Sequence, residues 1–84
     1  MSAGDKTSRI RKEVTARLVK TEGVIRKRLE RAKSERDLPR HANPADLARY
    51  IMAVLDGIAV AGATGASRKK LRSIAEVALR AWPS

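Results

Sequence analysis

The sequence predicts an all-α protein of three helices, and three observations point to this fold class. Over residues 8–35 the apolar residues recur three or four positions apart, which is the spacing of one helix face. Two short segments, 37–43 and 65–67, interrupt such patterns and carry Pro, Asn, Gly and Ser, the residues of helix ends. The chain has one Tyr, one Trp and no Phe, so its apolar surface consists mainly of Leu, Ile, Val and Ala. Together with the abundant Arg, Lys and Glu, these residues favour helix.

The first helix is expected over residues 8–35, with residues 1–8 as a disordered N-terminus and residues 9–84 as one helical domain. Its apolar stripe comprises Ile10, Val14, Leu18, Thr21, Ile25, Leu29 and Ala32. Steps of three and four residues keep this stripe on one face, which should pack on a partner. Pro39 cannot extend a helical hydrogen-bond ladder and marks the end of the helix.

The second helix is expected over residues 44–64, because Asn43 is a favoured N-cap and Pro44 suits the first helical position. This helix is apolar on most of its surface, which predicts that it is buried nearly all round. Ala53, Gly57 and Ala61 recur every four residues and form a smooth ridge that another helix could approach closely. The ridge has two interpretations, a contact between subunits or close packing within one chain.

The third helix is expected over residues 68–81, after Gly65 as a left-handed stop and Ser67 as the N-cap. Its apolar stripe comprises Leu71, Ile74, Ala75, Ala78, Leu79 and Trp82. Both connections between the helices are short, so consecutive helices should pack antiparallel.

The net charge is +10, and residues 1–40 contribute +7 of it, with thirteen Lys and Arg against six Asp and Glu. This excess has two interpretations, a well-solvated charged surface or attraction to polyanions. Residues 50–66 are too short to cross a membrane and include Asp56, so they read as a bundle helix. Without an apolar segment near the start to direct secretion, a cytoplasmic location is expected.

No arrangement for catalysis or metal binding stands out in the sequence. There is no Cys, and His41 lies in a polar connection without a second ligand residue, so we interpret it as a solvated side chain. Asp56 is the one unusual carboxylate, with catalysis, pairing with an Arg, or exposure as its alternatives. We therefore expect no enzyme and no cofactor or metal.

A DNA-reading helix-turn-helix is also not expected. The short turn at residues 65–67 follows a helix that is too apolar to lie across a phosphate backbone. Arg68, Lys69, Lys70 and Arg72 at the start of the third helix could attract phosphate but do not read bases. No specific contact with nucleic acid is expected from this chain alone.

Several segments in order carry a resemblance to a known family. They are residues 31–39 (RAKSERDLP), 43–50 (NPADLARY), 54–60 (VLDGIAV), 65–67 (GAS) with Leu71, and 78–83 (ALRAWP). From about residue 9 to its end, the chain resembles the C-terminal, ligand-binding and dimerisation part of TetR-family transcriptional repressors. It departs from the family in having Arg36 where Gly is frequent and Asp56 where Gln is frequent.

The resemblance implies a bacterial regulator fragment that lacks the N-terminal helix-turn-helix and several helices of the ligand pocket. It implies that the last two helices pair across a two-fold axis as a four-helix bundle, with a second copy or a full-length relative as partner. A small-molecule effector is implied as well, although the pocket would be incomplete. The implied interface residues are Ala53, Gly57, Ile58, Ala61, Leu71, Ile74, Ala78 and Trp82.

Overall fold

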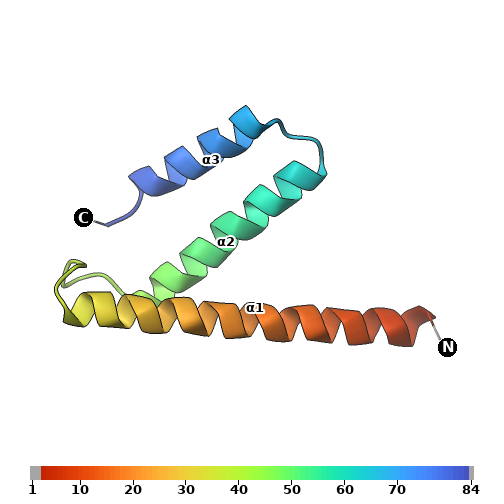
Figure 1. The fold of residues 1–84 in the computed structure, drawn as a ribbon, viewed down its shortest axis with the longest axis horizontal. Helices are drawn as coiled ribbons and strands as arrows, with labels where there is room; N and C mark the ends of the chain where they lie inside the picture. The colour runs from red at the N-terminus through yellow and green to blue at the C-terminus, as the bar shows by residue number, and fades with distance from the viewer. Residues whose placement is uncertain (1–2, 84) are drawn as a thin grey trace.

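The computed structural model describes residues 3–83, which form three α-helices joined by two short connections (Figure 1). Helix α1 spans Ala3–Ser34, α2 spans Pro44–Ala63 and α3 spans Arg68–Arg80. The predicted all-α class is confirmed for this part of the chain, where no residue belongs to a strand. Each helix runs back against the direction of the preceding one, as the short connections predicted (Figure 1).

Helix α1 begins at Ala3, earlier than the start near Ser8 that the sequence pattern suggested. Most of the segment expected to be disordered, residues 1–8, is therefore helical, while residues 1 and 2 lie outside the described residues. Asp5 in the first turn favours this longer helix, because a carboxylate interacts well with the positive end of the helix dipole.

The C-terminal end of α1 is a left-handed turn centred on Arg36, which has a φ of 66°. The Arg36 N–H donates to the Lys33 carbonyl at 3.0 Å, and the Asp37 N–H donates to the Ala32 carbonyl at 2.8 Å. This pair of bonds satisfies carbonyls that the helix end would leave free, in the arrangement called the Schellman motif. Helix α1 thus ends before Pro39, and Arg36 adopts the conformation for which glycine is usual.

The predicted caps of the other two helices are confirmed. The Asn43 side chain accepts a hydrogen bond from the Asp46 N–H at 3.1 Å, and the Ser67 hydroxyl accepts one from the Lys70 N–H at 3.2 Å. Gly65, with a φ of 99°, makes the left-handed turn that ends α2. Local sequence signals therefore determine where α2 and α3 begin and where α2 stops.

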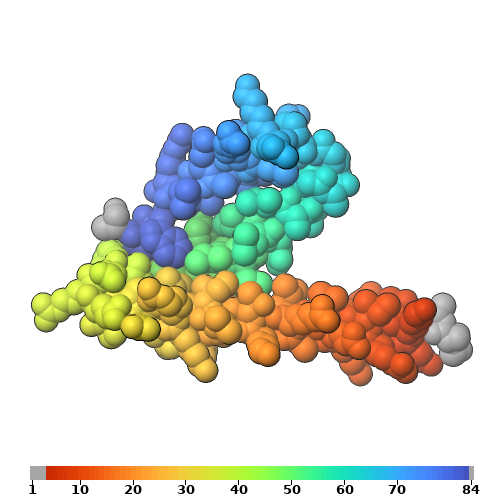
Figure 2. Space-filling model, viewed as in Figure 1, coloured from red at the N-terminus to blue at the C-terminus, as the bar shows by residue number. Residues whose placement is uncertain are grey.

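The three helices lie in a single layer, and the chain extends 52 × 30 × 14 Å. Helix α2 lies between the other two, packing on the C-terminal half of α1 and on α3 (Figure 1). Within residues 3–83, the Cα atoms of α1 and α3 nowhere approach within 8 Å. The N-terminal half of α1 projects past the rest of the molecule, as Figure 2 shows.

The core is small and lies where α1, the first connection and α2 meet. Of the side chains described, three are buried, namely Ala42, Ala48 and Met52. The prediction that α2 is buried nearly all round is wrong for the single chain, because a helix with one neighbour on each side keeps its outer surfaces open. None of the helices within residues 3–83 is long and apolar enough to span a membrane.

Candidate functional site

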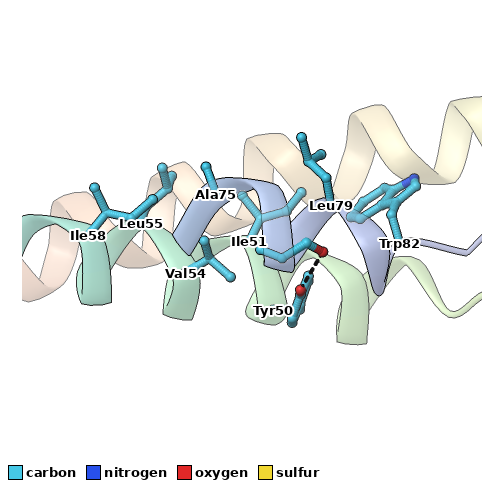
Figure 3. A pocket seen from close by; sticks show the side chains of 9 residues that line it. Tyr50, Ile51, Val54, Leu55, Ile58, Ala75, Leu79 and Trp82 are labelled. Atoms are coloured by element: carbon cyan, nitrogen blue, oxygen red, sulfur yellow. Dashed lines mark hydrogen bonds between the residues drawn. The ribbon is translucent and has the colours of Figure 1, made fainter. Parts of the chain in front are cut away.

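An apolar groove with a volume of about 380 Å³ lies between α2 and α3 (Figure 3). Its lining comprises Tyr50, Ile51, Val54, Leu55, Ile58, Ala75, Ala78, Leu79 and Trp82. The two helices supply these residues at three- and four-residue intervals, so the groove follows directly from their apolar stripes. A groove of this volume is within the range of ligand pockets, but its walls carry almost no polar group.

Tyr50 supplies the hydroxyl of the groove and uses it to join α2 to α3. This hydroxyl donates a hydrogen bond of 2.6 Å to the carbonyl oxygen of Ala78 (Figure 3). Ala78 lies in the last turn of α3, and its carbonyl also accepts the Ala81 N–H at 3.2 Å, so the Tyr50 hydroxyl is a second donor to this helix end. The sequence analysis missed this contact, although a lone Tyr on an apolar helix is a signal that its hydroxyl needs a partner.

The groove is open rather than enclosed. The Leu79 side chain is 71 % exposed and that of Leu55 is 50 % exposed, although both are large and apolar. Trp82, at one end of the groove, is half-buried. In Figure 3, Leu55, Ile58 and Leu79 extend toward the same side of the two helices. A covering group that is itself apolar would remove these side chains from water.

The eight residues implied as an interface fall into three places. Ile58, Ala78 and Trp82 line the groove. Ala61 and Leu71 are half-buried. Ala53, Gly57 and Ile74 are exposed and do not line the groove. The single chain therefore brings three of the eight together in one concavity and leaves three others facing solvent.

The ridge of small residues on α2 has no helix packed on it at Gly57. A Cβ atom placed on Gly57 would meet nothing within 4 Å, whereas one placed on Gly62 would lie 3.7 Å from Leu71 Cδ1. The Leu71 side chain of α3 thus lies beside Gly62, a position that the sequence analysis did not single out. The space beside Gly57 is open to another molecule.

The polar residues that the sequence raised as candidates for chemistry lie on the surface of the molecule. Asp56 and His41 are both exposed, and residues 3–83 hold no cluster of three His, Asp or Glu side chains suited to a metal ion. Of the three alternatives for Asp56, exposure is the one found. Between α1 and α2, Glu22 and Arg49 approach to 3.9 Å as a solvent-exposed ion pair, which contributes little to stability.

The chain matches no protein-family model, and neither the curated proteins nor the solved structures include one that is significantly similar to it.

Proposed function

We propose that this chain is a dimerisation module of the type found in the C-terminal part of TetR-family regulators, and that α2 and α3 pair with a second copy. The proposed function does not include DNA reading, because the short turn at residues 65–67 follows a helix that is too apolar to lie across a phosphate backbone. The observation that carries it is the amount of surface that a single chain leaves uncovered. The resemblance noted in the sequence supplies the family.

The surface area supports association. One chain exposes 6933 Å², whereas folded monomers of its mass, 9.2 kDa, expose about 4,900 Å². The radius of gyration is 16.1 Å, against about 12 Å for a compact chain of this length. Each partner in a standard-size interface buries about 800 Å². The surplus of roughly 2,000 Å² is therefore enough for such an interface and leaves further surface beyond it.

The charge distribution favours α2 as the centre of contact between two copies. Two chains of net charge +10 repel each other over most approaches. Helix α2 contains one basic residue, Arg49, against Asp46 and Asp56, whereas α1 holds eleven basic residues against four acidic ones. A contact centred on α2 brings together the least basic helices of both chains and also covers their exposed apolar side chains.

Replacing Gly57 with Leu tests the proposal, because the structure separates its effects on the subunit and on the dimer. Within one chain the new side chain meets no neighbour, and Leu raises helix propensity by about 0.8–1.0 kcal/mol over Gly. In an interface at Gly57, overpacking costs about 1–3 kcal/mol at each of two symmetric sites. We expect a dimer of wild-type chains at tens of micromolar and a dissociation constant at least about 30-fold higher for Gly57→Leu.

Sedimentation equilibrium measures both dissociation constants. Ala63→Leu is the matched control, since Ala63 is exposed on α2 and the helical period places it on the face of Met52, about 120° around the helix from Gly57. This control should dimerise like the wild type. A wild-type monomer at these concentrations would exclude the proposed function, and an unchanged dimer of Gly57→Leu would remove the ridge from the interface.

The basic charge of α1 supports a second candidate function, non-specific binding to a polyanion. Lys6, Arg9, Arg17, Lys20 and Lys27 are all exposed, and the helical period places them along one side of α1. Such a stripe can follow a phosphate backbone without reading bases. This candidate predicts retention on heparin and binding to random duplex DNA that falls steeply with salt. Absence of retention at low salt excludes it.

A further inference from the structure

The N-terminal half of α1 carries an apolar stripe that nothing in the described part of the chain covers. Ile10, Val14 and Leu18 are 52 %, 50 % and 40 % exposed. They continue the face that carries Ile25 and Leu29, which are half-buried where α2 packs on α1. The stripe is therefore the extension of an existing helix–helix interface beyond the point where α2 diverges.

Helix α2 supplies a second apolar wall to the same space. Ala48 and Met52 are its residues buried at the junction with α1, and Ala59 continues their line two turns further along the helix. Ala59 is exposed, because α1 has moved away at its level. Figures 1 and 2 show the opening between the N-terminal half of α1 and the C-terminal half of α2. We call this space the wedge.

The α1 wall of the wedge is basic at its edges. Residues 3–21 contain six Lys and Arg against two Asp and Glu, a net charge of +4. By helical spacing, Lys6 and Arg17 follow one edge of the Ile10–Val14–Leu18 stripe together with Glu13, and Arg11 follows the other edge. All three basic residues are exposed. A group that enters the wedge has to cover apolar walls and face a basic rim.

We propose that the wedge binds an amphipathic helix of a partner protein whose apolar face is flanked by Asp and Glu. A helix with its side chains is about 10 Å across. It would pack on the bare stripe in the way that α2 packs on Ile25 and Leu29, further along the same face of α1. Its acidic flanks would complement Lys6, Arg11 and Arg17.

Three other occupants fit less well. A second copy of α1 would set like charges against each other along both edges of the stripe. By helical spacing the stripe continues the face of α1 that packs on α2, so it faces the angle between these helices, which a flat bilayer cannot enter. Duplex nucleic acid would neutralise the rim but would leave the carbon side chains of Ile10, Val14 and Leu18 uncovered.

Calorimetric titration with two synthetic helices tests the proposal on the intact chain. The first peptide carries Leu at the a and d positions of three heptads and Glu at the e and g positions, and the second has Lys in place of Glu. We expect the Glu peptide to bind and the Lys peptide to bind at least about tenfold more weakly. Val14→Asp should weaken binding of the Glu peptide by at least about tenfold, since it places a carboxylate in the apolar wall.

Val19→Asp is the matched control, because Val19 is 68 % exposed on the other side of α1 and should leave binding unchanged. Absence of binding by the Glu peptide, equal binding of both peptides, or equal effects of the two Asp variants would each overturn the proposal. If phosphatidylserine vesicles or random duplex DNA bind in a way that Val14→Asp abolishes, while the Glu peptide does not bind, the stripe belongs to a bilayer or a polyanion.

The wedge and the dimer contact can be tested independently. Val14→Asp should not change the dissociation constant of the dimer, and Gly57→Leu should not change binding of the Glu peptide. These two measurements show which proposal fails if only one of them does.

Discussion

Replacing Arg36 with Gly should stabilise the protein, because Arg36 holds a left-handed conformation at the end of α1. Its φ of 66° costs a residue with a side chain about 1–2 kcal/mol, a penalty that glycine does not incur. Glycine adds about 0.4–1 kcal/mol of conformational freedom to the unfolded chain, which offsets part of the gain. The Arg36 side chain is exposed, so little packing is lost. The net expectation is a gain of about 0.5–1 kcal/mol.

Thermal unfolding followed by far-ultraviolet circular dichroism measures this gain as a rise in Tm of roughly 2–8 °C for a chain of this size. All variants should be compared at one protein concentration, because association would itself raise Tm. Arg36→Ala is the control, since it removes the side chain and keeps a Cβ atom at the strained position. If Arg36→Gly is no more stable than Arg36→Ala, the backbone strain assigned to this turn is wrong.

Three further substitutions test individual contacts by urea denaturation. Tyr50→Phe removes the hydrogen bond to Ala78 and should lower the free energy of unfolding by about 0.5–1.5 kcal/mol; unchanged stability would contradict a formed bond. Met52→Ala removes the largest of the buried side chains and should cost about 2–5 kcal/mol, so a loss below 1 kcal/mol would mean that the α1–α2 junction is not a packed core. Arg49→Ala breaks an exposed ion pair with Glu22 and should change stability by no more than about 0.5 kcal/mol; a larger loss would show that this pair helps to hold α1 on α2.

The sequence predicted best the features that depend on neighbouring residues. Asn43 and Ser67 cap their helices through atoms three positions away, and Gly65 turns the chain by its own backbone freedom. The turn at Arg36 depends equally on local geometry, but the residue there gives no sign of it. Arg rarely adopts the left-handed backbone conformation, so the sequence analysis did not expect it at a position where glycine is usual.

Features that depend on how helices cross were predicted less well. The apolar stripe of α1 was expected to face a partner along its whole length, but α2 diverges and leaves Ile10 and Val14 bare. The difference in length between the two helices explains part of this. The 32 residues of α1 span about 48 Å, whereas the 20 residues of α2 span about 30 Å and cannot cover the whole stripe. The bond from Tyr50 to Ala78 joins residues 28 positions apart and needs the final angle between α2 and α3. The groove residues Ile51, Val54 and Leu55 were not singled out for the same reason.

The positions of Tyr50 and Trp82 determine which part of this protein intrinsic fluorescence monitors. They are the chain's single Tyr and single Trp, and both line the groove between α2 and α3. Intrinsic fluorescence therefore reports on that hairpin, whereas α1 contains no aromatic residue and contributes only to the backbone signal. Fraying of the projecting half of α1 would reduce ellipticity without altering Trp82 emission, and opening of the hairpin would alter both. The two optical signals thus distinguish unfolding of the arm from unfolding of the groove.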